Sequence, residues 1–140
     1  MYFTSLLLTS TILASSVLAE SLSCVNLSAS EGFETGPPFI RHSTLVEMKI
    51  LVDSGAVPPI AVPGLRSQEV PLAPGKGKLC IINLALGTQT FHPDEISDFL
   101  KAAITCYNNG QEPDTQGTLT AENGQAQIVE IQPSGGQCGL

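Results

Sequence analysis

The sequence predicts an α+β fold: a small α/β sandwich of β-α-β-β-α-β, ferredoxin-like topology, with an antiparallel sheet and two disulfides. Three observations support this prediction. Strand-like and helix-like patterns alternate twice along residues 20–140, a length that suits a single domain. A strongly amphipathic helical pattern follows the most apolar strand pattern. All four cysteines of the chain, an even number, fall within the same range.

Residues 1–19 precede this domain and have the pattern of a cleavable signal peptide. Residues 6–14 are an apolar run of the length of a signal-peptide core, and Val17 and Ala19 suit positions −3 and −1 of a cut before Glu20. The run is too short and too rich in serine and threonine for a membrane anchor. The sequence therefore predicts a secreted, extracellular protein.

The first half of the domain has the pattern strand, helix, strand. Residues 23–28 alternate polar and apolar side chains, as a half-buried strand does. Residues 39–52 place apolar side chains on one helical face and stop at Ser54-Gly55, although their β-branched content leaves a strand as the alternative. Residues 57–75 contain five prolines, so a strand there must lie at a sheet edge.

The second half begins with residues 79–86, which are nearly all apolar and typical of a central strand. Because side chains alternate along a strand, we expect Cys80, Ile82, Leu84 and Leu86 to face the helices. That orientation also lets Cys80 reach a cysteine on the following helix.

The clearest element is a helix over residues 93–107. Pro93 suits a first helical turn, and Asp94 and Glu95 complement the helix dipole there. Asn108-Asn109-Gly110 is a typical helix end. The apolar residues form one continuous stripe: Ile96, Phe99, Leu100, Ala103, Ile104 and Tyr107.

A β-hairpin ends the pattern. Residues 118–121 and 127–131 alternate apolar and polar side chains and flank Asn123-Gly124. This dipeptide is the usual sequence of a type I′ turn, in which both central residues have positive φ.

Counting alone leaves three disulfide connectivities open. In the predicted topology the first and last strands are antiparallel neighbours, which brings Cys24 close to Cys138. The helix after the third strand runs back and returns Cys106 to the level of Cys80. The topology therefore predicts the disulfides Cys24–Cys138 and Cys80–Cys106. The cysteine spacing is too wide for a zinc knuckle, and we expect neither a metal nor another cofactor.

Asn26-Leu27-Ser28 is a glycosylation sequon, so in a secreted protein Asn26 is expected to carry a glycan. Strand alternation would turn Val25 and Leu27 inward and leave Asn26 outward. The chain carries a net charge of −7, which disfavours binding to nucleic acid and stable association with anionic membranes. Nothing in the sequence indicates an oligomeric state.

Two groups of residues have the types needed for chemistry. His42 and His92, with Arg41 or Lys101, would lie at one end of the sheet as in a two-histidine ribonuclease, but we favour ordinary solvated histidines because the net charge repels RNA. Asp94, Glu95 and Asp98 are the types of a cation site, but a stabilised helix start and a solvated face explain them better. We therefore expect no catalytic residues and no enzyme.

The chain resembles the secreted fungal proteins with the killer-toxin-like α/β-sandwich fold, a group of virally encoded toxins and pathogen effectors. The resemblance is carried by the signal peptide and by these features: the Cys24 strand, the run Leu79-Cys80-Ile81-Ile82-Asn83-Leu84, the helix with Cys106, and the terminal Cys138. It implies an effector, or virulence protein, that binds a host or competitor protein outside the cell. A membrane-active toxin or antimicrobial and a secreted hydrolase inhibitor are the alternatives. Loops at residues 56–74 and 110–117 are the expected contact surface.

Overall fold

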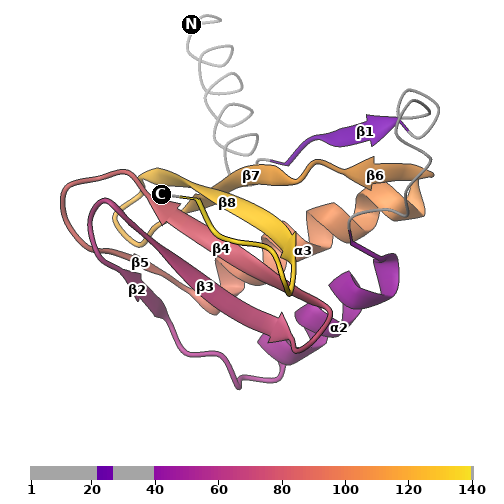
Figure 1. Cartoon of the computed structure of the whole chain (residues 1–140), viewed down its shortest axis with the longest axis horizontal. Coiled ribbons are helices and arrows are strands. Elements are labelled where there is room, and N and C mark those ends of the chain that lie inside the picture. Colours follow the sequence, from indigo (N-terminus) through magenta and orange to yellow (C-terminus); the bar gives the residue numbers. More distant parts are fainter. Residues whose placement is uncertain (1–21, 27–39, 140) are drawn as a thin grey trace, which may run out of the picture.

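The computed structural model describes residues 22–26 and 40–139, so the predicted signal peptide lies outside the described residues. The described part is an α+β fold, as predicted (Figure 1). Its elements, in chain order, are β1 (Cys24–Asn26), α2 (His42–Asp53), β2 (Ile60–Val62), β3 (Arg66–Ala73), β4 (Gly77–Asn83), β5 (Gln89–Phe91), α3 (Pro93–Asn108), β6 (Gln111–Pro113), β7 (Gln116–Thr120) and β8 (Ala126–Pro133).

The centre of the molecule is a four-stranded antiparallel sheet in the order β3-β4-β8-β7. β3, which lies within the proline-rich residues 57–75, is at an edge of the sheet, as predicted, because Pro71 cannot donate to a ladder. Pro71 falls between Val70 and Ala73, where the pairing of β3 with β4 shifts register. The apolar β4 is central and buried along its whole length, again as predicted.

Both helices cover one face of this sheet, and the hydrophobic core lies between the two layers (Figure 1). The apolar stripe of α3 supplies one side of the core, which confirms the helix predicted from its spacing. Alternate residues of the strands supply the other side: Val70 and Leu72 of β3, Leu79 and Ile81 of β4, Leu119 of β7, and Val129 and Ile131 of β8.

The strand arrangement differs from the predicted β-α-β-β-α-β order. β1 does not join the four-stranded sheet but pairs with β6, with Cys24 opposite Pro113. The last strand, β8, was expected beside β1 but is paired with β4 and β7 instead. A second small sheet, absent from the prediction, pairs β2 with β5. A strand of three residues has too little pattern to specify its partner, whereas β8 presents alternate apolar side chains over eight residues.

The segment with two interpretations, residues 39–52, is helical from His42 to Asp53. α2 and α3 run antiparallel. At one end of the pair the Tyr107 hydroxyl donates to the Ile40 carbonyl, and at the other Ser97 Oγ donates to Asp53 Oδ1 at 2.6 Å. Burial, with Glu112 nearby, raises the pKa of Tyr107 to about 12.

The hairpin β7–β8 is confirmed, but its turn is not type I′. Gly124 has φ 90° and its N–H donates to the carbonyl of Ala121 at 2.9 Å. Leu65 is the one non-glycine residue with positive φ in the described part of the chain, so Asn123 does not have it. These features are those of a type I turn followed by a left-handed glycine, the usual three-residue hairpin loop.

The predicted disulfide pairing was wrong. Cys24 is bonded to Cys106, and Cys80 is bonded to Cys138. β1 lies beside β6, which follows directly after α3, so Cys24 meets the cysteine in the last turn of that helix.

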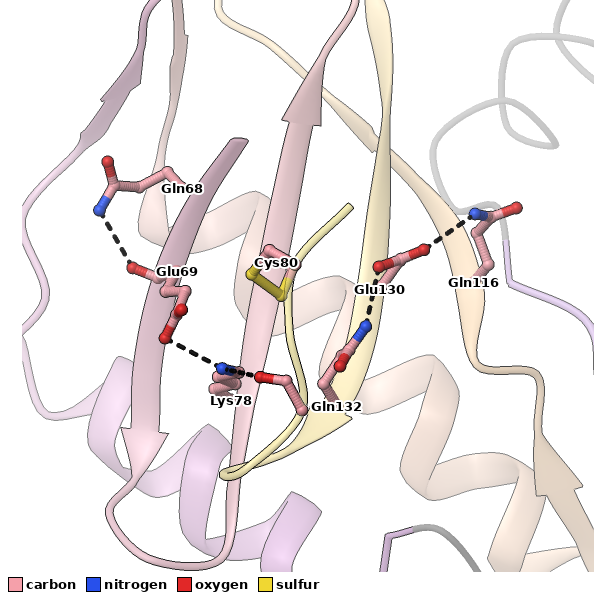
Figure 2. The surroundings of a disulfide bond; sticks show 9 residues. Gln68, Glu69, Lys78, Cys80, Gln116, Glu130 and Gln132 are labelled. Carbon is pink, nitrogen blue, oxygen red and sulfur yellow. Dashed lines mark hydrogen bonds and ion pairs between the residues drawn. A yellow bond between two sulfur atoms is a disulfide. The ribbon is translucent and has the colours of Figure 1, made fainter. Parts of the chain in front are cut away.

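Cys80 also faces the opposite side of the sheet from the one predicted, because Leu79 and Ile81 are the residues of β4 that enter the core. The chain after β8 turns back across the sheet face that the helices leave uncovered, and Cys138 meets Cys80 there (Figure 2). Lys78, 5% exposed, holds the same segment by donating to the Gly136 carbonyl, and its ammonium lies 3.0 Å from Glu69.

The predicted inward orientation is wrong for the Val25 side chain of β1. Val25 was expected to face inward but is 36% exposed, because β1 lies outside the main sheet. Leu27 and Ser28 lie outside the described residues, so glycosylation of Asn26 stays a prediction.

Candidate functional site

Three large apolar side chains are exposed on two neighbouring loops. Leu65 is 53% exposed, Leu84 is 53% exposed and Leu86 is 87% exposed. Leu65 belongs to the loop between β2 and β3, and the other two belong to the loop between β4 and β5. Leu65 N–H donates to the carbonyl of Ala85 at 3.0 Å, which joins the two loops. We call this surface, Leu65 with Leu84 and Leu86, the leucine tip.

The position of the leucine tip follows from the sheets. Both loops cross from the four-stranded sheet to the two-stranded sheet β2–β5, on the left of Figure 1. Arg66 pairs with Asn83 at one end of the crossing, and Val62 pairs with Gln89 at the other. Each loop is therefore fixed at both ends by strand pairing, so the leucines lie on a supported surface.

Asn83, the last residue of β4, holds the two loops together through hydrogen bonds of its side chain. Its side chain is fully buried. The amide group donates to the carbonyl oxygens of Val62, the last residue of β2, at 2.9 Å and of Pro63 on the first loop at 3.2 Å. It also donates to the Gly87 carbonyl at 2.9 Å on the second loop, and its Oδ1 accepts from the Ala85 N–H at 2.9 Å. One side chain thus satisfies backbone groups of both loops that are shielded from water.

Leu65 has φ 58°, in the left-handed region that favours glycine. For a residue with a side chain this conformation costs about 1–2 kcal/mol. The surrounding structure holds a large apolar residue in a strained conformation and exposes it to water. Neither the strained conformation of Leu65 nor the exposure of its side chain stabilises the fold. Backbone strain of this kind is concentrated at functional sites.

Gly64 permits the close approach of the two loops. A Cβ atom added at this position would lie 2.0 Å from the backbone oxygen of Leu86. No rotamer change relieves such a contact, because the atom it meets belongs to the backbone. The loops must then separate.

We therefore predict that Gly64→Ala lowers the free energy of unfolding by about 3 kcal/mol, the upper part of the range for overpacking. Urea denaturation measures this loss. Gly87→Ala is the matched control, since a Cβ there meets nothing within 4 Å. Equal stability of the two variants would contradict the close approach.

Two shallow hollows border the leucine tip. One, of about 550 Å³, is lined by residues 64–67. The other, of about 500 Å³, lies between Leu84 and the β7–β8 hairpin, with Gln127 and Ile128 in its wall. The exposed leucines and the adjoining hollows make this end of the molecule an uneven surface.

The two histidines do not form a shared site. His42 begins α2 and its ring lies 5.6 Å from that of Tyr107, near the end of α3. His92 precedes α3, and its Nε2 lies 2.6 Å from Glu122 Oε2. At 1.5 Å per residue, α3 separates the two positions by about 20 Å. The ribonuclease arrangement is therefore wrong, because the helices are antiparallel.

The carboxylates at the start of α3 lie where the sequence predicted. Asp94 and Glu95 are in its first turn, and burial, with Asp98 and Asp94 nearby, raises the pKa of Glu95. Across residues 22–26 and 40–139 no cluster of three or more metal-ligating side chains is present.

The expected contact loops are only partly the exposed ones. Residues 110–117 contain β6 and the start of β7, and β6 is paired with β1, so this segment is mostly strand. Residues 56–74 contain Leu65 but are largely β2 and β3. Leu84 and Leu86 were expected to face the helices and do not, because β4 ends at Asn83. The signal that marks this end is Asn83 itself, a polar residue at a core-facing position.

None of the helices in the described residues has the length and apolar character of a membrane span. Comparison of the chain with family models, curated proteins and solved structures finds no match.

Proposed function

We propose that this is a secreted, effector-like protein that acts outside the cell by binding a host or competitor protein through the leucine tip. The observation that carries the proposal is the exposure of three leucines on loops that the fold holds in place, one of them in a strained conformation. Grouped exposed apolar residues on a soluble protein usually mark an interaction site.

The rest of the structure supports this proposal. Two disulfides join the segments near the ends of the described chain to its body, and such bonds persist in oxidising, extracellular surroundings. The resemblance to fungal effectors with the killer-toxin-like fold suggests the same compartment and a binding role. A membrane-active toxin is disfavoured because the net charge of −7 repels anionic lipid.

The test is a double variant, Leu84→Ser with Leu86→Ser. Truncating two anchors of a small interface should cost about 2 kcal/mol, or about 30-fold in affinity. The wild-type protein, the double variant and a control variant are used to capture proteins from extracellular fluid of a host or competitor, and affinities are then measured with the purified partner.

Ile50→Ser is the matched control, since Ile50 is 65% exposed on α2, outside the leucine tip. We expect the control to bind like the wild type. A partner that binds the double variant and the wild type equally would refute the proposed site, and inhibition of a purified extracellular hydrolase would instead favour the inhibitor alternative.

A further inference from the structure

The charge on the leucine tip differs in sign from that of the protein. Residues 63–66 and 84–88 contain one charged residue, Arg66, and it is a cation in a chain of net charge −7. Among the described residues Arg66, like Arg41 and Lys101, is in no ion pair, whereas Lys49, Lys76 and Lys78 each lie within 3.0 Å of a carboxylate. The leucines are therefore accompanied by a guanidinium that still has its pairing capacity.

Arg66 has its backbone fixed by strand pairing. It is the first residue of β3, it follows Leu65 directly and it is paired with Asn83 in the β3–β4 ladder. Arg66 lines the same hollow as Leu65, so a partner that fills this hollow would also remove water from around the guanidinium. Electrostatic attraction strengthens as water is excluded, and arginine binds carboxylates through two parallel hydrogen bonds.

An apolar surface alone would not distinguish a lipid from a protein. The charges do. An anionic bilayer is repelled by the other acidic residues of the protein, and one arginine cannot offset a net charge of −7 at a wide flat surface. A single carboxylate among apolar side chains, carried on a short peptide segment, meets Arg66 without approaching the rest of the molecule.

From this charge complementarity we infer that the segment bound by the leucine tip is an acidic, apolar peptide: an aspartate or glutamate placed opposite Arg66, flanked by large apolar side chains that contact the leucines. This inference rests on the proposed function and specifies the chemistry of its partner.

The test uses a phage-displayed library of random peptides, selected on the immobilised wild-type protein. The enriched peptides should combine at least one Asp or Glu with large apolar residues. Two of them are then synthesised with a fluorescent label, and their affinities are measured by fluorescence polarisation for Arg66→Glu, Arg66→Gln, Leu86→Ser and the wild type.

Lys101→Glu is the matched control for Arg66→Glu. Lys101 is exposed on α3, and both substitutions change the net charge equally. We expect Arg66→Glu to weaken peptide binding at least tenfold and Arg66→Gln several-fold, while Lys101→Glu changes it less than twofold. Circular dichroism checks that each variant is folded. We expect the Arg66 variants to fold, because Arg66 is exposed on an edge strand.

The outcomes separate the inference from the proposed function. Enriched peptides without acidic residues, or binding lost in Leu86→Ser but kept in Arg66→Glu, would overturn the inference and leave the proposed function standing. Peptide binding unaffected by Leu86→Ser would overturn both. Binding to neutral phosphatidylcholine vesicles, or to vesicles that also contain phosphatidylserine, would assign the leucine tip to lipid and also overturn both.

Discussion

Replacing Asn83 with aspartate is expected to lower the free energy of unfolding by about 4 kcal/mol, the cost of a buried charge that has no opposite charge nearby. Asn83 is fully buried, and the two hydrogens of its amide are shared among three backbone carbonyls. An aspartate has the same shape but no donor, so its carboxylate would face three carbonyl oxygens in a site shielded from water. Urea denaturation of the variant beside the wild type measures the loss.

Asn123→Asp is the control for this substitution. Asn123 lies in the exposed turn between β7 and β8, where Asn83's network of buried carbonyls has no counterpart. We expect this variant to stay within about 0.5 kcal/mol of the wild type, as surface substitutions usually do. Similar losses in the two variants would mean that the amide of Asn83 does not hold the loops.

Asn83 connects the stability of the protein to its proposed function. The same amide that ends β4 fixes the two loops from which Leu65, Leu84 and Leu86 project. A milder variant, Asn83→Ser, should therefore weaken partner binding more than its loss of stability explains. The leucine tip would be less ordered before the global fold is lost, because its backbone groups depend on one side chain.

The elements with strong local signals could be predicted from the sequence. α3 has a continuous apolar stripe, Pro93 at its start and Gly110 after its end, and each signal acts within a few residues. The edge position of β3 follows from Pro71, and the β7–β8 hairpin follows from its apolar alternation and Gly124. These elements can be predicted without knowing which distant segments of the chain contact each other.

The strand partners and the candidate site could not be predicted in the same way. Three residues of β1 fit several positions equally well, so the choice of β6 depends on long-range packing. The alternation of side chains along a strand also does not show at which residue the strand ends. Continuing it past Asn83 placed Leu84 and Leu86 in the core, whereas both are exposed in the structure.

The predicted disulfide pairing was wrong for the same reason. The observed pairing leads to a second prediction with a large effect. The double variant Cys80→Ser with Cys138→Ser should lose about 4 kcal/mol, because a crosslink over 58 residues no longer restricts the unfolded chain. Thermal or urea unfolding under non-reducing conditions measures it. Peptide mass mapping of the wild type should show Cys24–Cys106 and Cys80–Cys138, and a Cys24–Cys138 peptide would contradict the structure.

The double variant Cys24→Ser with Cys106→Ser is the matched comparison, since its crosslink spans 82 residues and the same model gives a similar loss. Hydrogen exchange distinguishes the two. Loss of the Cys80–Cys138 bond frees the segment that covers Lys78 and Ile82, so exchange should rise at the centre of β4. Loss of the other bond should raise exchange in β1 and β6. Identical exchange patterns would show that the disulfides act only on the unfolded chain and do not hold these segments in place.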